Sequence, residues 1–231
     1  RNIVPSEDQV FHSLYPANGE LRWQKLEVDS DQIEVNYDDI NWDSPYERLG
    51  SVGLLNLGYA YTEVESEAET MALVSTRKVP AFLVNGKVFQ GEPYFGNFFK
   101  TAVKLHKGKN RILVKFAGKY KRKFRFQITP TNKKAIFLED FTKPDLVPEL
   151  KQTEFPIAVP VLNIQETWLR GARIVFEEKN GSFHQEFELD PIPPFGIVKM
   201  PLLLKLDEPR KKDLDFRIKL MCEGVLDAAD L

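Results

Sequence analysis

Cysteine is nearly absent from this chain of 231 residues, in which Cys222 is the only one. No intrachain disulfide can form, so the fold must be stabilised by its hydrophobic cores alone. No apolar run approaches the length of about 20 residues that a membrane-spanning helix needs. We therefore expect no membrane span, while the lack of disulfides remains compatible with export.

Recognisable catalytic motifs are also missing. The string nearest to the Gly-x-Ser-x-Gly elbow of serine hydrolases is Gly50–Gly53, which has the wrong spacing. The three histidines, His12, His106 and His184, are scattered, and none lies in a metal-spaced pair. A catalytic pair of acidic residues that are distant in sequence but close together in the fold remains an open alternative. We expect no catalytic site in this chain, and an enzyme acting alone is the least favoured function.

What the chain has in abundance is turns and alternating runs. Fifteen prolines and thirteen glycines punctuate a composition that is 42% hydrophobic and 12% aromatic, which is typical of a globular, many-turned β protein. The clearest stretch is Val79–Ile128. Within it, Asn85 and Gly86 separate two apolar runs and predict a two-residue hairpin, because both residues tolerate positive φ.

The end of that stretch alternates with a period of two residues. Apolar and basic side chains exchange places along it, with Arg122 as the one interruption: Tyr120, Phe124, Phe126 and Ile128 alternate with Lys119, Lys121, Lys123 and Arg125. This period predicts a strand with one buried face and one solvated face.

Length and turn spacing predict two β domains. The polar turn Thr129–Asn132, followed by two lysines, marks a boundary between residues 1–130 and 131–231. The second part holds about seven short strands, with a hairpin predicted at Asn180-Gly181, which is the density of an immunoglobulin-like β-sandwich. In the first part, residues 37–47 are predicted to form a polar loop.

Charge is distributed unevenly, although the formal net charge is only −2. Residues 1–70 hold fifteen acidic and four basic residues, whereas residues 76–134 hold sixteen basic residues and one acid. The basic block could bind a polyanion. The simpler explanation, which we favour, is that basic and acidic strands pair across a sheet, with Glu27, Asp29 and Asp31 as the partners. We expect no nucleic-acid partner.

The densest cluster of oxygen-bearing side chains lies around residue 40. Ca²⁺ takes six to eight oxygen ligands, so Asp38, Asp39 and Asp43 are candidate ligands for part of a Ca²⁺ site. The simpler explanation is a solvated acidic loop. We expect no other cofactor.

Aromatic side chains in or near loops are candidate platforms for a sugar, although packing in the core is the simpler explanation for such residues. With one neighbouring acid, the candidate ligand-binding residues are Trp42, Tyr46, Glu92, Tyr94 and Phe95.

Three motifs resemble the galactose-binding-like jelly rolls. They are the V-N-G of residues 84–86, the Gly91-Glu92-Pro93-Tyr94 string, and residues 105–114, which fit L-x-x-G-x-N-x-(I/L)-x-V. In the third motif Gly108 turns the chain, and Asn110 is expected to hydrogen-bond the turn backbone. Together with Val159–Asn163 in the second domain, these motifs are similar to the non-catalytic N-terminal half of exported bacterial prolyl-oligopeptidase-like α/β hydrolases.

The resemblance implies a jelly roll over residues 1–130 and a catalytic serine in a later, covalently linked domain. The chain would then be an accessory or substrate-positioning module of a larger hydrolase in the periplasm or on the cell surface of a bacterium. The chain opens on Arg1 instead of Met, and we expect a processed product. The alternative is a free-standing carbohydrate-binding protein that uses loops around Trp42 and Tyr94.

Overall fold

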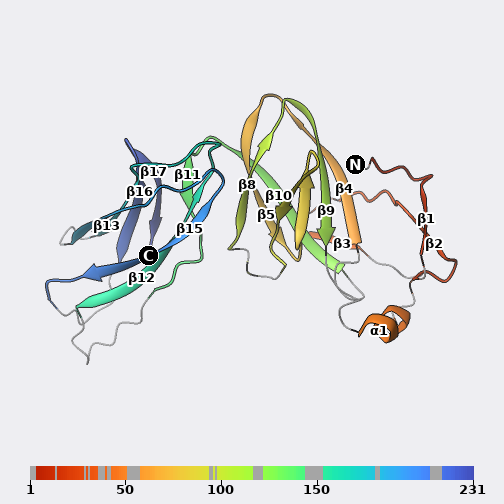
Figure 1. Cartoon of the computed structure of the whole chain (residues 1–231), viewed down its shortest axis with the longest axis horizontal. Helices are drawn as coiled ribbons and strands as arrows, with labels where there is room; N and C mark the ends of the chain where they lie inside the picture. Colours follow the sequence, from red (N-terminus) through yellow and green to blue (C-terminus); the bar gives the residue numbers. More distant parts are fainter. Residues whose placement is uncertain are drawn as a thin grey trace. The chain divides into compact units, whose positions relative to one another are not determined.

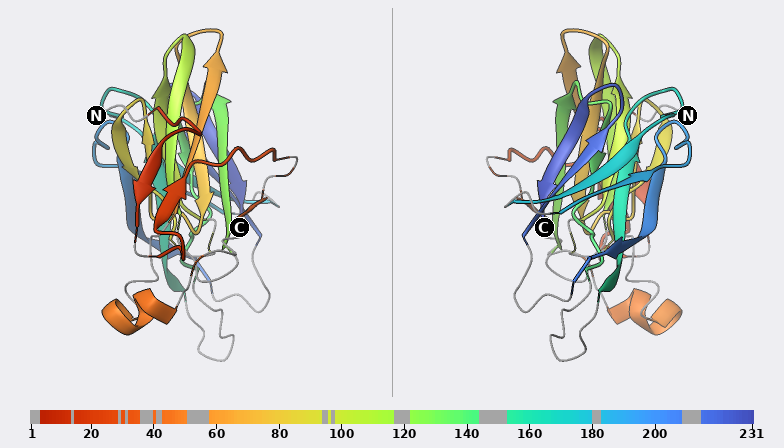
Figure 2. Two further views of the ribbon diagram at one scale, coloured as in Figure 1. Left: turned by 90° about the vertical axis from the view of Figure 1, so that its right-hand side faces the viewer. Right: turned by 90° about the vertical axis from the view of Figure 1, so that its left-hand side faces the viewer.

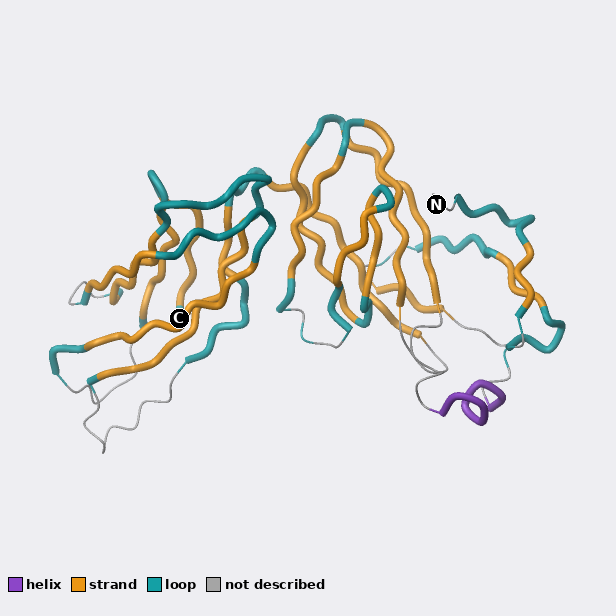
Figure 3. The backbone as a smooth tube through the Cα atoms, viewed as in Figure 1, coloured by secondary structure: helices purple, strands orange, loops and turns teal. Residues whose placement is uncertain are grey.

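The computed structural model describes residues 4–13, 15–28, 30, 32–35, 40, 43–50, 58–93, 96, 98–116, 122–143, 153–179, 183–208 and 215–231. These residues form antiparallel β-sheets and one short helix (Figures 1 and 3), which confirms the predicted all-β class. The chain divides into two compact units, Arg1–Pro130 and Thr131–Leu231. Each unit has a hydrophobic core of its own. In the described part of the chain, no helix has the length and apolar character needed to cross a membrane.

Unit 1 carries most of the strands. Its described elements, in chain order, are β1 (Val10–His12), β2 (Glu20–Arg22), β3 (Gln32–Val35), α1 (Asp43–Leu49), β4 (Gly58–Ser66), β5 (Thr70–Arg77), β6 (Ala81–Val84), β7 (Lys87–Gln90), β8 (Lys100–Leu105), β9 (Gly108–Phe116) and β10 (Arg122–Thr131). Two sheets have the orders β3-β10-β5-β8 and β4-β9-β6-β7, and β1 pairs with β2 separately. The two sheets form a sandwich, because one hydrophobic cluster takes its residues from both of them.

The core of unit 1 lies between these two sheets. The rings of Phe116 on β9 and Phe124 on β10 stack with centroids 4.4 Å apart, and Phe82 on β6 meets Phe126 on β10 at 5.2 Å. Phe124, Phe126 and Ile128 all pack in this cluster, as the alternation predicts. Gly58 must be glycine, because a Cβ there would lie 2.1 Å from the Phe116 ring.

The predicted hairpin at Asn85 and Gly86 is confirmed. Both residues have positive φ, 51° and 84°, and Val84 faces Lys87 across a two-residue turn. The turn at Gly108 is different. It joins β8 to β9, which belong to separate sheets and do not pair with each other.

The predicted polar loop over residues 37–47 is wrong in part, since α1 begins within it at Asp43. The helix carries an acid, Asp43, in its first turn and a base, Arg48, in its last turn. Both charges oppose the helix dipole and stabilise so short a helix. The helix projects beyond the strand ends of unit 1 (Figure 2).

Unit 2 contains seven described strands, the number that the sequence predicts. They are β11 (Ala135–Phe137), β12 (Glu154–Asn163), β13 (Arg173–Glu178), β14 (His184–Glu188), β15 (Ile197–Lys205), β16 (Phe216–Met221) and β17 (Val225–Asp230). The sheets have the orders β11-β12-β15 and β14-β13-β16-β17, a three-plus-four arrangement as in immunoglobulin-like sandwiches. The predicted turn at Asn180-Gly181 lies outside the described residues.

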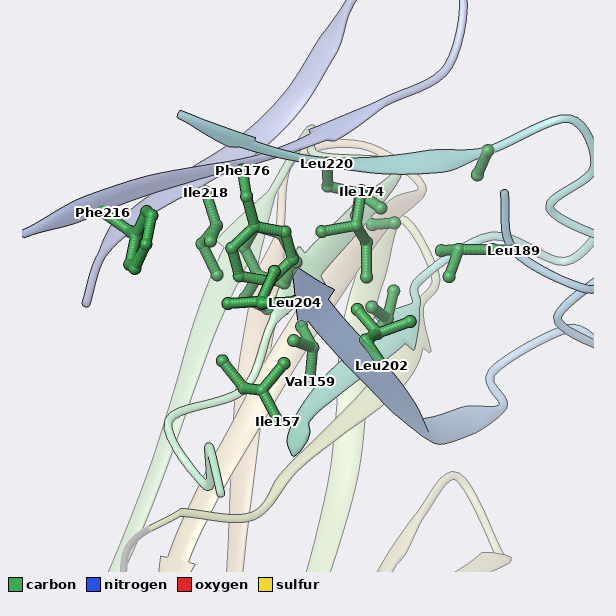
Figure 4. Packing of buried hydrophobic residues seen from close by; sticks show 14 of the residues in the cluster. Ile157, Val159, Ile174, Phe176, Leu189, Leu202, Leu204, Phe216, Ile218 and Leu220 are labelled. Atoms are coloured by element: carbon green, nitrogen blue, oxygen red, sulfur yellow. The ribbon is translucent and has the colours of Figure 1, made fainter. Parts of the chain in front are cut away.

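Facing strands supply the core of unit 2 (Figure 4). Val159 on β12, with Ile174 and Phe176 on β13, is fully buried. At one edge, the side chain of Gln185 on β14 bonds the backbone of β15. Its Oε1 accepts from Lys205 N at 3.0 Å, and its Nε2 donates to Leu203 O at 3.4 Å. This amide therefore closes an edge that would otherwise offer free backbone groups.

Candidate functional site

The start of the predicted ligand loop, after β7, is held against the segment that follows β5. Val79 N donates to Glu92 O at 2.9 Å, and Gly91 N donates to Pro80 O at 3.1 Å. Glu92 N donates to the Thr76 hydroxyl at 2.7 Å. Gly91 has no room for a side chain, because a Cβ would lie 2.1 Å from Val79 O. Backbone contacts of this kind fix where the loop begins.

Two of the five predicted ligand-binding residues lie in the described part of the chain. Tyr46 is on α1 and is 52% exposed, whereas Glu92 is half-buried at the start of the loop. Trp42, Tyr94 and Phe95 lie outside the described residues. The predicted loop site therefore stays a prediction.

The predicted Ca²⁺ site is described at one residue only. Asp43 is exposed in the first turn of α1, while Asp38 and Asp39 lie outside the described residues. Within the described ranges, no three His, Cys, Asp or Glu side chains gather closely enough to hold a metal ion. The Ca²⁺ site also stays a prediction.

Asn110 organises the turn that carries the third sequence motif, and its side chain is fully buried. Its Oδ1 accepts from His106 N and from Asn85 Nδ2, each at 2.8 Å. Its Nδ2 donates to His106 O at 2.8 Å and to Gly108 O at 3.0 Å. The expectation that this asparagine hydrogen-bonds the turn backbone is confirmed, and the same side chain ties this turn to the hairpin at Asn85.

Three lysines of the basic block pair with acidic residues on or beside neighbouring strands, as the simpler explanation holds. The pairs are Lys104 with Glu69 at 2.7 Å, Lys109 with Glu63 at 3.1 Å and Lys123 with Glu34 at 3.0 Å. Of the expected partners, Glu27 pairs instead with Lys25 at 3.4 Å, and Asp29 and Asp31 lie outside the described residues, so their pairing stays a prediction. Register explains the difference, because β3 places Glu34 opposite Lys123 on β10.

These pairs shift the acidity of two carboxyl groups. The hydrogen bond from Lys109 holds the pKa of Glu63 below its usual value, as does the bond from Lys104 for Glu69. The pKa of Tyr61 is raised, first by burial and then by the bond that its hydroxyl donates to Glu63 at 3.0 Å. All of these groups lie on the surface of unit 1, where ion pairs add little stability.

The sequence reasoning missed the outward side of the sheet β4-β9-β6-β7, named here the outer sheet face. Its central members, one or two from each strand, are Tyr59, Tyr61, Leu83, Val88, Leu113 and Lys115. The signal lay in β4, where Tyr59 and Tyr61 alternate with the core-facing Ala60. That alternation places both tyrosines on the side away from the core.

No protein-family model and no curated protein matches this chain. Among solved structures it is similar to a GH2 β-galacturonidase from Eisenbergiella tayi, at 14% identity and a TM-score of 0.45, over 80% of this chain and 36% of that one. It is also similar to a β-glucuronidase 2 from Bacteroides uniformis, at 10% identity and a TM-score of 0.42, over 74% and 26%. It is similar as well to an exo-chitosanase from Amycolatopsis orientalis, at 13% identity and a TM-score of 0.41, over 75% of this chain and 25% of that one.

The chain thus spans about a quarter to a third of the length of these solved chains. All three are named as glycoside-cleaving enzymes, and none is named as a prolyl-oligopeptidase-like hydrolase. The finer resemblance drawn from the sequence motifs therefore stays a prediction.

Proposed function

We propose that this chain is the non-catalytic β-domain part of a larger exported bacterial hydrolase. In that enzyme it positions substrate or shields an active site that another domain contributes. The observation that carries the proposal is the buried Asn110, which joins two turns at the motif shared with galactose-binding-like jelly rolls. The proposed catalytic partner is a covalently linked prolyl-oligopeptidase-like domain, and the proposed location is the periplasm or the cell surface.

The separate cores of the two units support a modular role. Each unit buries its own apolar cluster, as domains strung along a longer chain do. A module of this kind needs no contact with the catalytic domain to hold its shape. It can therefore present a fixed surface beside an active site.

The intact mass of the native gene product tests the proposal. We expect a mass well above the 26.6 kDa of this chain, with a nucleophile elbow in the additional sequence. A native product close to 26.6 kDa would overturn the module proposal. In the longer enzyme, removing residues 1–231 should reduce kcat/KM for large substrates more than for a small chromogenic ester.

Carbohydrate binding is the second candidate, and the exposure of Tyr46 on α1 favours it. A glycan-affinity column measures retention of the whole chain directly. If the loops hold the sugar, Trp42→Ala and Tyr94→Ala abolish retention and leave thermal unfolding unchanged. Unchanged retention in both variants would refute the loop site.

A further inference from the structure

The outer sheet face carries an uninterrupted apolar row across all four strands. Tyr61 on β4 lies opposite Leu113 on β9, Leu113 lies opposite Leu83 on β6, and Leu83 lies opposite Val88 on β7. Residues directly opposite on one face of an antiparallel pair have Cβ atoms about 5 Å apart. Val88 at the end of the row is 66% exposed, so nothing in the described part of the chain covers it.

A second row runs beside the first and contains a cation. Lys115 on β9 has Tyr59 opposite it on one side and Ala81 on the other. Lys115 is half-buried, and Tyr59 is 51% exposed. Lys109, further along the same strand face, pairs with Glu63. Lys115 makes no ion pair with any residue that the structure describes.

We propose that the outer sheet face binds an anionic polysaccharide. The exposed ring of Tyr59 stacks on a sugar, and the Lys115 ammonium group pairs with a carboxylate or sulfate of the glycan. This inference rests on the carbohydrate-binding candidate and moves its site from the loops to the sheet. It does not depend on an attached hydrolase domain.

The lone lysine argues for an occupant that brings negative charge. An apolar protein surface docked here would bury Lys115 without a partner, and an unpaired buried charge strongly disfavours binding. A glycan with acidic groups supplies that partner. Its C–H groups are also attracted to the negative face of the Tyr59 ring.

Next to the apolar row, the outer sheet face carries polar side chains that can hydrogen-bond the hydroxyl groups of a sugar. Glu63 accepts from Tyr61 at 3.0 Å and from Lys109 at 3.1 Å, and Arg111 lies beside it at 4.0 Å. A few fixed polar groups around an apolar surface orient a ligand that has both kinds of surface. An acidic peptide would bind this face less well, because β9 and β6 lie inside the sheet. Their backbone groups are already paired, so a peptide backbone could not hydrogen-bond to them.

Affinity electrophoresis of the whole chain tests the proposal. The probes are dextran, carboxymethyl-dextran, dextran sulfate, alginate and poly-glutamate. We expect retardation by at least one charged glycan, none by neutral dextran, and weakening as salt rises. Carboxymethyl-dextran and dextran sulfate share one polysaccharide backbone, so the difference between their binding identifies which acidic group pairs with the Lys115 ammonium group.

Variants locate the site. Tyr59→Thr keeps a strand-forming residue and should weaken binding about 30-fold, the loss typical of a residue central to an interface. Lys115→Gln should weaken it about tenfold, and Lys115→Arg should restore it. Lys123→Gln removes the same charge from the other sheet and should leave binding unchanged. Thermal unfolding of each variant checks the fold, and Lys115→Gln tests the site even if Tyr59→Thr fails to fold.

Three outcomes overturn the inference. If charged glycans bind but both Tyr59→Thr and Lys115→Gln behave like the unaltered chain, the site lies elsewhere, while carbohydrate binding stands. If poly-glutamate binds as tightly and loses affinity in the same variants, the surface recognises acidic peptides. If no charged glycan binds, the inference fails, while the loop site keeps its own test on the glycan-affinity column and the intact-mass test of the hydrolase module is unaffected.

Discussion

The outward sheet faces of the two units differ in how completely their charges are paired. On the sheet β14-β13-β16-β17 of unit 2, basic and acidic side chains form a network of ion pairs, here called the charge lattice. Its pairs are Glu177 with Lys219 at 2.6 Å, Arg217 with Asp230 at 3.2 Å and Arg173 with Glu186 at 3.0 Å. The outer sheet face of unit 1 also has an ion pair, Lys109 with Glu63, but its centre carries two tyrosines, an apolar row and Lys115, which pairs with none of the described residues.

This difference indicates which of the two faces would be stabilised by binding a partner. A face whose charges satisfy one another is compatible with water and gains little from being covered. A face with exposed apolar groups and a cation such as Lys115, which pairs with none of the described residues, gains from a ligand of opposite charge. The two units share one feature of their construction: among the described residues, each has one asparagine at 0% exposure, Asn110 in unit 1 and Asn163 in unit 2.

The largest expected effect tests that shared construction. Asn110→Ala removes an amide that satisfies the backbone of His106, and Asn163→Ala removes one that donates to Thr167 O, Ile192 O and Pro193 O. Each loss leaves buried polar groups unpaired and should cost about 3 kcal/mol or more. Calorimetry of the whole chain should show two transitions, of which each variant lowers only its own.

Lys123→Gln is the control for this experiment, because it removes only an exposed ion pair and should shift neither transition measurably. If Asn110→Ala lowered both transitions equally, the two units would unfold as one, and the comparison between them would lose its basis.

A smaller effect is expected at the edge of unit 2. Gln185→Ala deletes two hydrogen bonds to β15 and should cost about 1 kcal/mol. The freed edge should also raise self-association, which analytical ultracentrifugation measures. Gln185→Glu retains the acceptor for Lys205 N and loses the donor, so it should fall between the two. A monomeric Gln185→Ala chain of unchanged stability would show that other contacts close this edge.

The smallest expected effect is on the stability of the two units at acidic pH. The hydrogen bond from Lys219 lowers the pKa of Glu177 in the folded state, as the bond from Lys109 does for Glu63, from the usual value of 4.5. A carboxyl group whose pKa is lowered by folding stabilises the protein above pH 4.5, and this contribution is lost as pH falls below it. Glu177→Gln should therefore flatten the pH dependence of unit 2 below pH 4.5, and Glu63→Gln that of unit 1.

Thermal unfolding between pH 3 and pH 7, with the two transitions resolved, measures both slopes. Glu154→Gln, which removes a pair at 3.2 Å between exposed side chains, is the matched control. Equal slopes in Glu177→Gln and the unaltered chain would mean that the charge lattice of unit 2 does not contribute to stability.

Local features of the fold could be predicted from the sequence because they depend on few neighbouring residues. The hairpin at Asn85-Gly86 follows from two residues that accept positive φ, and the buried side of β10 follows from alternation. The helix at Asp43 was missed because seven residues carry too weak a periodic signal. The outer sheet face was missed because alternation shows that Tyr59 and Tyr61 share a side, but not what lies beside them.

By itself, then, the sequence determined the all-β class, the Asn85-Gly86 turn and the side of β10 that faces the core, since the period of two is a local property of the chain. Only the tertiary structure decided which strands are neighbours. The pairing of β4 with β9 and of β9 with β6 joins residues far apart in sequence. That register gives Lys109 an acidic partner in Glu63 and sets Lys115 among tyrosine and alanine, because cross-strand neighbours are chosen by the packing of whole sheets.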